Sequence, residues 1–312
     1  MKILRYEASM AGRWDEFVDR SKNGTFLLRR AYMDYHADRF EDHSLVFCTD
    51  GGDWLAVLPA NKAGSRLSSH DGLTYGGFVS GPRMTTPAML ECFDALLAYL
   101  RSGGFTALRY KTIPHIYASH PAEEDRYALF RLGARLYRRD VLAVALPGQP
   151  LPYQERRTRK MKQAAKAGLE LKREIDFAPF WRVLEANLES VHGAKPVHSL
   201  AEITLLAGRF PGNIGLHVVR EGGEAVAGVV VYDTGRVAHV QYIGSNAQGR
   251  ELGALDLLFP ALIQQEYAKR PYFDFGISNE DDGKVLNVGL IEQKEGFGAR
   301  AVAHDFYEVD IS

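Results

Sequence analysis

The stretch of residues 237–276 constrains the fold most, because its pattern predicts a strand, a short loop, a helix and a second strand. Residues 237–243 (VAHVQYI) are apolar or aromatic and contain no Gly or Pro, which is typical of a central strand. Residues 244–246 (GSN) interrupt this run, and a helix opens at residues 248–254 and continues to residue 267. Its apolar residues fall on one stripe: Leu255, Leu258, Phe259, Leu262 and Ile263. Residues 272–275 (YFDF) predict the second strand.

The loop between this strand and this helix is basic and contains glycine. Such a loop offers free backbone N–H groups and the positive end of a helix dipole, which together suit a pyrophosphate. The alternative is that Gly and Ala at the helix start only allow the helix to pack tightly on the strand.

A second feature is that one pattern of elements occurs twice. In the first half, strands at 44–47 and 54–59 flank a turn at 50–53, and a strand running into a Gly-rich loop (67–78), a helix (89–100) and a strand (105–111) follow. In the second half, strands at 216–219 and 225–232 flank a turn at 221–224, before the stretch described above. This order predicts two similar α/β domains with mixed sheets, at residues 1–147 and 153–312, joined by a Pro-rich linker. The residues themselves barely agree between the copies, so chance is the alternative.

Further helices lie outside the repeated pattern. The first 45 residues predict two, one around Trp14 and one over residues 32–40. Residues 156–166 place six Arg and Lys side chains on one helix, which is either a solvated surface or an anion-binding face. Ser199 and Glu202 have the spacing of a helix capping box.

Composition excludes several classes of protein. The chain has 312 residues, 38 basic and 39 acidic, so its net charge of −1 argues against general nucleic-acid binding. The first residues do not resemble a signal peptide, and no apolar run approaches the roughly 18 residues that a membrane-spanning helix needs. We therefore expect a cytoplasmic protein without membrane insertion, whose two cysteines are reduced.

Several segments together resemble a known family. They are RRTRKMKQAAKAGLEL, FWRVLEANLESVHGAKPV, YFDFG and GLIEQKEGFGAR, in this order. The chain resembles the FemAB-like, tandem-GNAT N-acyltransferases, and HDGLTYGGF, YKTIPHIY and YFDFGISNED resemble enzymes of bacterial polysaccharide gene clusters. The resemblance implies two tandem GNAT-like domains with a cleft between them. It also implies an acyl-CoA donor, such as acetyl-CoA or 3-hydroxybutyryl-CoA, and a nucleotide-linked amino sugar of the dTDP-3-amino-3,6-dideoxyhexose type as acceptor.

In this family a loop of pattern Gln/Arg-x-x-Gly-x-Gly/Ala holds the pyrophosphate. Arg250 and Gly253 match the pattern, whereas Leu255 stands where it has Gly or Ala. The resemblance therefore implies a cofactor site in the second domain that comprises Ile243, Gly244, Gly249, Arg250, Gly253, Ala254, Asn279 and Asn287.

Transfer of an acyl group to an amine needs a neutral amine, a well-placed thioester and donors for the oxyanion. His239 and Gln241 lie on one face of the key strand, and Tyr242 on the other. We expect His239 to accept the amine proton, Gln241 to bind the substrate and Tyr242 to protonate the leaving thiolate. His70 and Asp71 are the corresponding catalytic candidates in the first domain. Each has a structural alternative: a core histidine, a turn or a core tyrosine.

The acceptor candidates lie in what the sequence predicts to be polar loops: Lys111, His115, Tyr127, Lys195 and His198. Lys and Arg suit a diphosphate because they keep their charge. Lys294 is expected at the surface. His192 and His198 lack further ligands at zinc spacing, so no metal is predicted.

Three hypotheses follow from these observations. The leading one is an acyl-CoA-dependent N-acyltransferase that acts on a nucleotide-linked amino sugar by direct attack of the amine on the thioester. The second is a FemAB-type transferase that takes amino acids from aminoacyl-tRNA for peptidoglycan, and the third is a GNAT fold that only binds its ligands.

Overall fold

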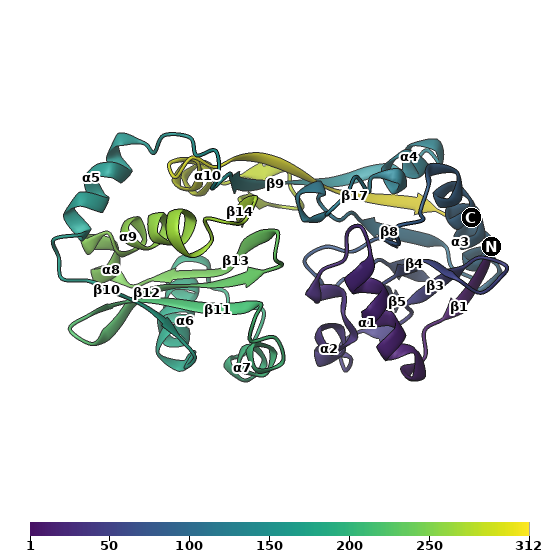
Figure 1. Cartoon of the computed structure of the whole chain (residues 1–312), viewed down its shortest axis with the longest axis horizontal. Helices are drawn as coiled ribbons and strands as arrows, with labels where there is room; N and C mark the ends of the chain where they lie inside the picture. The colour runs from purple at the N-terminus through teal and green to yellow at the C-terminus, as the bar shows by residue number, and fades with distance from the viewer. Residues whose placement is uncertain (312) are drawn as a thin grey trace. The chain divides into compact units, whose positions relative to one another are not determined.

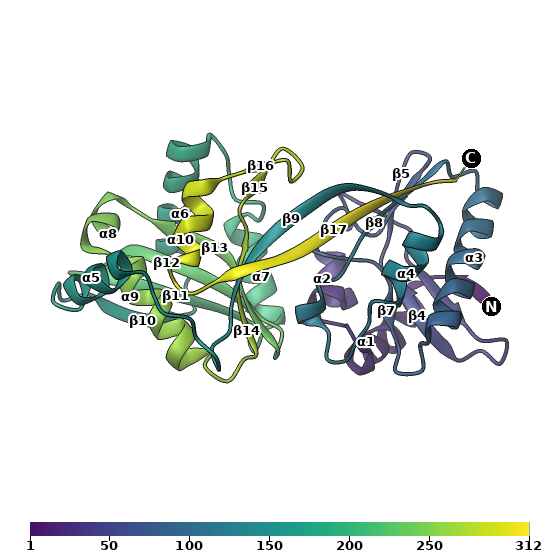
Figure 2. The same cartoon turned by 90° about the horizontal axis from the view of Figure 1, so that it is seen from above.

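The computed structural model describes residues 1–311, except for the side chains of Val191 and His192. The chain forms two compact units (Figures 1 and 2). The N-terminal unit contains residues 1–140 and 281–284 and the chain from residue 303 onward. The C-terminal unit contains residues 141–280 and 285–302. Both β9 (Arg135–Ala145) and β17 (Arg300–Asp310) contain a point of this division. The predicted domain boundary at residues 147–153 stays a prediction.

The N-terminal unit holds two sheets. In the first, β1 (Lys2–Arg5), β3 (Leu45–Cys48), β4 (Trp54–Leu58) and β7 (Val79–Ser80) are neighbours in this order, and all pairs are antiparallel. In the second, β17 pairs with β8 (Ala107–Lys111), and β6 (Arg66–Ser68), β5 (Asn61–Ala63) and β2 (Glu41–Asp42) follow. Only β6 and β8 run parallel within this sheet. The helices are α1 (Ala11–Arg20), α2 (Arg30–Met33), α3 (Thr86–Ser102) and α4 (Glu124–Arg131).

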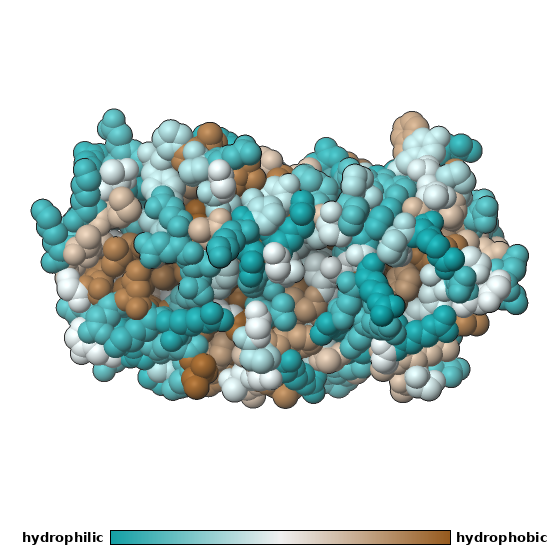
Figure 3. Space-filling view, in the orientation of Figure 1, coloured by the Kyte–Doolittle hydropathy of each residue, from teal (hydrophilic) through white to brown (hydrophobic). Residues whose placement is uncertain are grey.

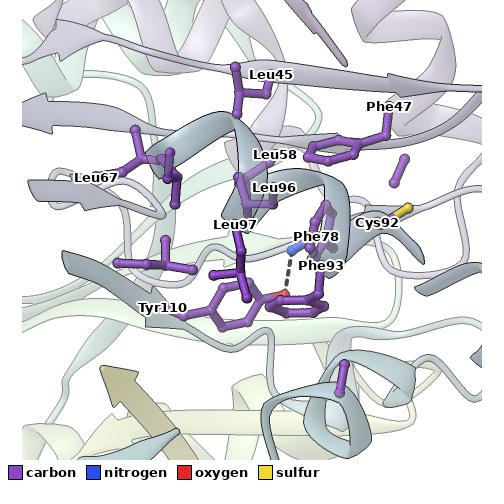
Figure 4. Close-up of a cluster of buried hydrophobic side chains, with 14 of the residues drawn as sticks. Leu45, Phe47, Leu58, Leu67, Phe78, Cys92, Phe93, Leu96, Leu97 and Tyr110 are labelled. Atoms are coloured by element: carbon purple, nitrogen blue, oxygen red, sulfur yellow. Dashed lines mark hydrogen bonds between the residues drawn. The ribbon is translucent and has the colours of Figure 1, made fainter. Parts of the chain in front are cut away.

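The core of this unit lies where α3 packs against the strands. Figure 4 shows Phe93 and Leu97 of α3 beside Phe78 and Tyr110. The Tyr110 hydroxyl accepts a hydrogen bond from the Phe78 backbone N–H at 2.7 Å, the dashed line in Figure 4, and donates one to Asp125 at 2.7 Å. Burial raises the pKa of Asp125 to about 6. The phenol thus satisfies two polar groups that would otherwise be buried without partners.

The C-terminal unit is built on one sheet. Its strands lie in the order β10 (Glu170–Glu174), β11 (Ile214–Glu221), β12 (Glu224–Asp233), β13 (Val237–Ser245), β14 (Tyr272–Ile277) and β9. All pairs are antiparallel except β13 with β14. The helices are α5 (Glu155–Ala164), α6 (Ala178–His192), α7 (Leu200–Arg209), α8 (Ala247–Leu252), α9 (Ala254–Ala261) and α10 (Val288–Glu295), and β15 (Asn279–Glu280) pairs with β16 (Val285–Leu286).

Helices cover both faces of this sheet, with α6 on one side and α9 on the other (Figure 1). Gly228 and Gly244 leave room for Phe180 of α6, because a Cβ atom at Gly228 would lie 2.6 Å from its ring. On the opposite face, Phe259 of α9 packs with Phe273 and Phe275 of β14. Because helices cover both faces of the sheet, both faces of β12 and β13 are buried, and these strands are nearly continuous apolar runs.

The predicted repeat of elements is confirmed. Each unit contains a hairpin, β3–β4 or β11–β12, and then a strand, a helical segment and a strand that runs parallel to the first: β6–α3–β8 and β13–α8/α9–β14. The capping box of Ser199 and Glu202 is also present at the start of α7. The mixed α/β architecture is therefore the one predicted, a pair of tandem GNAT-like domains.

Two predicted helices are wrong in extent. The helix expected over residues 32–40 ends at Met33, and a 3-10 turn (Asp34–His36) follows, in which the His36 ring lies against the Gly72 carbonyl. Aromatic side chains have no strong helix preference, so tertiary contacts decide. The helix expected to run to residue 267 is broken at Gly253, whose φ of 72° ends α8 before α9 begins. A π turn (Leu262–Glu266) then completes the segment.

No helix among residues 1–311 is long and apolar enough to cross a membrane. The face drawn in Figure 3 is mainly hydrophilic, and its hydrophobic residues form separate patches.

Candidate functional site

The site begins where β13 and β14 separate. The two strands pair only over Val237–His239 and Tyr272–Asp274. After this point, Gln241 is an extra residue in β13, since Val240 and Tyr242 pair with the adjacent residues Val231 and Val230 of β12. Such a bulge bends a strand and increases its twist. On β14, Gly276 has a φ of 74°, and the pairing of this strand with β9 is irregular between Asp274 and Ile277. The result is a wedge between two parallel strands.

The mouth of the wedge is a pocket of about 410 Å³. Five of the predicted cofactor-binding residues line it together: Ile243, Gly244, Gly249, Arg250 and Gly253. The other lining residues come from helices α5, α6, α9 and α10 and from the end of β13: Arg157, Lys160, Asn187, Leu188, Ser245, Leu255, Asp256, Leu290 and Gln293.

Three other predicted cofactor residues do not line this pocket. Ala254 is buried in the core beneath it. Asn279 accepts a hydrogen bond from the Val141 N–H at 2.6 Å, and Asn287 caps α10 by accepting one from the Leu290 N–H at 3.0 Å. Both amide side chains therefore serve the backbone.

The pocket is electropositive. Arg157 pairs with buried Asp256 at 2.8 Å, and Arg250 donates to Asn187 at 3.0 Å and to the Ser245 carbonyl at 2.7 Å. Lys160 is exposed and has no partner among the residues that the structure describes. The first amides of α9, which follow Gly253, have no acceptor within the helix. These groups together favour an anionic ligand.

A smaller cavity of about 20 Å³ continues the pocket inward and shares Ile243, Leu290 and Gln293 with it. Its other walls are apolar except for Lys294: Val240, Phe259, Phe275 and Phe297. Lys294 is buried rather than at the surface as predicted, because α10 turns it toward β14. Its ammonium donates to the carbonyls of Gly276 at 3.1 Å and of Ile277 at 2.5 Å. Burial lowers the pKa of Lys294 to about 8, although nearby Asp274 raises it.

His239 lies at the last paired position of β13, directly before the strands separate. Its Nδ1 atom is 2.9 Å from the Oδ2 atom of Asp274, which is fully buried. Gln241, two residues further, carries a buried Oε1 atom without a hydrogen-bond partner in the described part of the chain. His239 and Gln241 therefore both lie at the closed end of the wedge.

Tyr242 does not face away from His239 as predicted, because the extra residue Gln241 interrupts the alternation: His239 pairs with Tyr232 and Tyr242 with Val230, two residues on the same face of β12. Tyr242 is buried under α6. Its ring packs edge-on against Trp181, and its hydroxyl accepts a hydrogen bond from the His198 backbone N–H at 3.0 Å and contacts the His198 ring. His198 is buried as well, whereas Lys195 in the same loop is exposed. The structure thus brings Tyr242 and His198 together, away from the residues that line the pocket.

In the N-terminal unit, three predicted residues lie together. His70 is buried, has a φ of 67°, and stacks on His36 with a centroid separation of 5.2 Å. Lys111 donates to the His70 carbonyl at 3.3 Å, and Asp71 is hydrogen-bonded to Asn61. Burial lowers the pKa of His70 to about 3 and that of Lys111 to about 8.

Lys111 is thus not in a polar loop, as predicted, but is the last residue of β8. Tyr127 likewise belongs to α4, and His115 to a 3-10 turn (His115–Tyr117). Both side chains are exposed.

Asp274 and Lys294 are the residues of the wedge that sequence reasoning missed as functional. An acid inside the apolar run YFDFG is a signal, because a carboxylate is rarely fully buried without a partner. No cluster of three potential metal ligands occurs among the residues that the structure describes, and the side chain of His192 lies outside them.

Comparison with known proteins agrees with this architecture. Residues 154–282 match the family described as acetyltransferase (GNAT) domain. No curated protein matches the chain. Among solved structures, FemX superposes with a TM-score of 0.71 at 12% identity, covering 99% of this chain and 97% of FemX.

Two further structures cover almost the whole chain. The C-terminal domain of a putative lysylphosphatidylglycerol synthetase from Agrobacterium fabrum has a TM-score of 0.62 at 13% identity and covers 97% of this chain and 92% of its own. A tandem GNAT protein from the clavulanic acid biosynthesis pathway has a TM-score of 0.52 at 11% identity and covers 100% and 98%.

These matches and the wedge define a class. The chain has the FemAB-like, tandem-GNAT fold, and its C-terminal unit carries a GNAT acetyltransferase domain. By this domain, the C-terminal unit is of the acyltransferase type.

Proposed function

We propose that this protein transfers an acyl group from acyl-CoA to the amino group of a nucleotide-linked amino sugar. The acceptor type is a dTDP-3-amino-3,6-dideoxyhexose. The observation that carries the proposal is the wedge between β13 and β14, which has an electropositive mouth and an apolar inner end. Acyl-CoA has a charged diphosphate at one end and a less polar thioester arm at the other, so its two ends match the two ends of the wedge.

In this proposal the diphosphate lies at Gly249–Ala254, where the first amides of α9, Arg250 and Lys160 neutralise its charge. The arm then follows residues 240–245 of β13, whose edge toward β14 is unpaired. The acyl group reaches the inner end of the wedge, near His239 and Lys294.

The reaction is a direct transfer. The amine nitrogen attacks the thioester carbonyl, the new C–N bond forms, the C–S bond breaks and the thiol leaves. His239 takes the amine proton. Gln241, Lys195 and His198 are the residues proposed to bind the acceptor in the C-terminal unit, and Lys111, His115 and Tyr127 are those proposed in the N-terminal unit. His70 and Asp71 remain the catalytic candidates of the N-terminal unit.

Lys160 provides a test of the donor site. Substitution Lys160→Ala should weaken acetyl-CoA binding about ten- to hundredfold, because a hydrogen bond to a charged group contributes about 1.5–3 kcal/mol. Titration calorimetry measures this loss. Lys162→Ala is the matched control, since Lys162 lies on the same helix, is exposed and does not line the pocket. Equal losses of acetyl-CoA affinity in both variants would contradict the assignment of this pocket as the diphosphate site.

The acceptor is tested separately by thiol release. The purified protein is mixed with acetyl-CoA or 3-hydroxybutyryl-CoA and a panel of dTDP-amino sugars, and free thiol is followed. If acyl-CoA binds but no amino sugar releases thiol, the acceptor proposal fails while the donor proposal stands.

A second candidate uses aminoacyl-tRNA as donor and a peptidoglycan precursor as acceptor. The observation that favours it is the exposure of Arg156, Arg159 and Lys162 on α5, beside the pocket, and of Lys166 just after that helix. RNA binding through these residues would weaken steeply with salt. Tighter binding of charged tRNA, measured by a mobility-shift assay, than of acyl-CoA would favour this candidate.

A further inference from the structure

Asp274 lies in an unusual place for an acid. It is fully buried, between Phe273 and Phe275 in β14. A carboxylate at such a site needs hydrogen bonds to offset the loss of water. Its Oδ1 atom accepts one from the Gly276 backbone N–H at 2.7 Å, and its Oδ2 atom lies 2.9 Å from the His239 Nδ1 atom. Each oxygen therefore has a separate partner.

The two ring nitrogens of His239 have different surroundings. Nδ1 points into the protein toward Asp274. Nε2 has no hydrogen-bond partner among the described residues and is not one of the polar atoms that are sealed from solvent without a partner. The ring as a whole is largely buried, with 11% of the side chain exposed. The one accessible nitrogen therefore belongs to the last residue of β13 that pairs with β14.

We propose that Asp274 is a positioning residue that holds the hydrogen of His239 on Nδ1, so that the Nε2 lone pair accepts the proton of the attacking amine. This inference deepens the proposed function and rests on it for the reaction. As the C–N bond forms, the amine proton moves to Nε2, and the Asp274 carboxylate stabilises the imidazolium. The C–S bond breaks, and the imidazolium returns the proton to the leaving thiolate, so protons and electrons balance.

The role of Gly276 makes the inference testable by one substitution. In Asp274→Asn only one side-chain oxygen remains. The Gly276 N–H can only donate a hydrogen bond, so this oxygen must face it as the acceptor. The new NH2 group then faces His239 Nδ1. Two donors cannot share a hydrogen bond, so Nδ1 must become the acceptor and the ring hydrogen moves to Nε2. The lone pair that takes the amine proton is then lost without removal of the histidine.

The first measurement uses wild-type protein labelled with 15N-histidine. At alkaline pH, the ring nitrogen shifts of His239 should report hydrogen on Nδ1. In Asp274→Asn they should report hydrogen on Nε2. His217, which is hydrogen-bonded to Tyr267, gives an internal control whose signal should not change.

The second measurement is kinetic. In Asp274→Asn we expect kcat to fall about 100-fold, within the range for loss of a general base, with the KM for acyl-CoA unchanged. Asp233→Asn is the matched control, since Asp233 pairs with Arg270 at the end of β12, and it should change neither property.

Three results would overturn the inference: hydrogen on Nε2 in the wild type, an unchanged tautomer in Asp274→Asn, or an unchanged kcat in that variant. If the variant does not fold, the wild-type spectrum still shows which ring nitrogen of His239 carries the hydrogen. A wild type with hydrogen on Nδ1 that transfers no acyl group to any amine counts against the proposed function and not against the position of the hydrogen.

Discussion

The ammonium group of Lys294 is enclosed by apolar side chains and by two backbone carbonyls, those of Gly276 and Ile277. An ammonium has three hydrogens, so two of them serve these carbonyls and one remains for the cavity. Burial favours the uncharged amine and lowers the pKa to about 8. Lys294 therefore holds the end of β14 in place while it offers a donor to the inner end of the wedge.

This lowered pKa has a direct effect on stability. Between about pH 8 and the unfolded value of 10.5, the unfolded chain binds more protons at Lys294 than the folded protein does. The stability of the wild type relative to Lys294→Met should therefore rise with pH in this window, by at most about 1.4 kcal/mol per pH unit, and stay level below it. Urea unfolding of both proteins at several pH values measures this difference. The lowered pKa of Lys111 cancels because both proteins contain it. A difference that is constant with pH would contradict the burial of the charge.

At the scale of elements, the break between α8 and α9 matters most. Gly253 takes a left-handed φ of 72°, which lets α9 begin afresh with its first amides at the pocket. A continuous helix from residue 247 would have used these amides internally. The sequence pattern showed the apolar stripe but not this break, because the stripe continues through it.

Gly253→Ala should lower the free energy of unfolding by about 1–2 kcal/mol, since a Cβ atom disfavours this backbone conformation. It should also weaken acyl-CoA binding, although the nearest atom to the new Cβ, the Lys160 carbonyl oxygen, is 3.5 Å away. Gly208→Ala in α7 is the control: it has open space and no left-handed φ, and should stabilise by about 0.5–1 kcal/mol. Urea unfolding and calorimetry give the two readouts, and equal behaviour of the two variants would contradict the prediction.

Local patterns predicted the elements well. The two hairpins, the strand–helix–strand of residues 237–276 and the capping box at Ser199 all depend on neighbours in the sequence. The long strands β9 and β17 were missed, because their partners are far away in the chain. In the site, five of the proposed cofactor residues line one pocket and are close in sequence, whereas the pairing of His239 with Asp274 spans 35 residues and depends on strand register.

At the scale of the whole molecule, each unit contains a histidine that is buried in its neutral form. Burial lowers the pKa of His70 in the N-terminal unit to about 3 and that of His217 in the C-terminal unit to about 4. Both values lie below the unfolded value of 6.5, so the neutral form stabilises the fold. This contribution is present above pH 6.5 and is lost as the pH falls toward the folded values.

We therefore expect both units to lose stability in mild acid, by about 2 kcal/mol per histidine between pH 6.5 and about pH 5. Urea unfolding at several pH values, followed by tryptophan fluorescence, measures the loss. His217→Gln should reduce the acid dependence relative to the wild type. An acid dependence that is the same in this variant would mean that the imidazole charges without cost.

The return of β17 to the N-terminal unit also bears on how the protein is made. Residues 107–111 of β8 find their antiparallel partner only at residues 306–310. While the chain is being translated, the first half leaves the ribosome long before this partner exists. The nascent N-terminal unit therefore keeps one strand edge open until residues 306–310 have been synthesised, and it is the part of the newborn chain that a chaperone would need to protect.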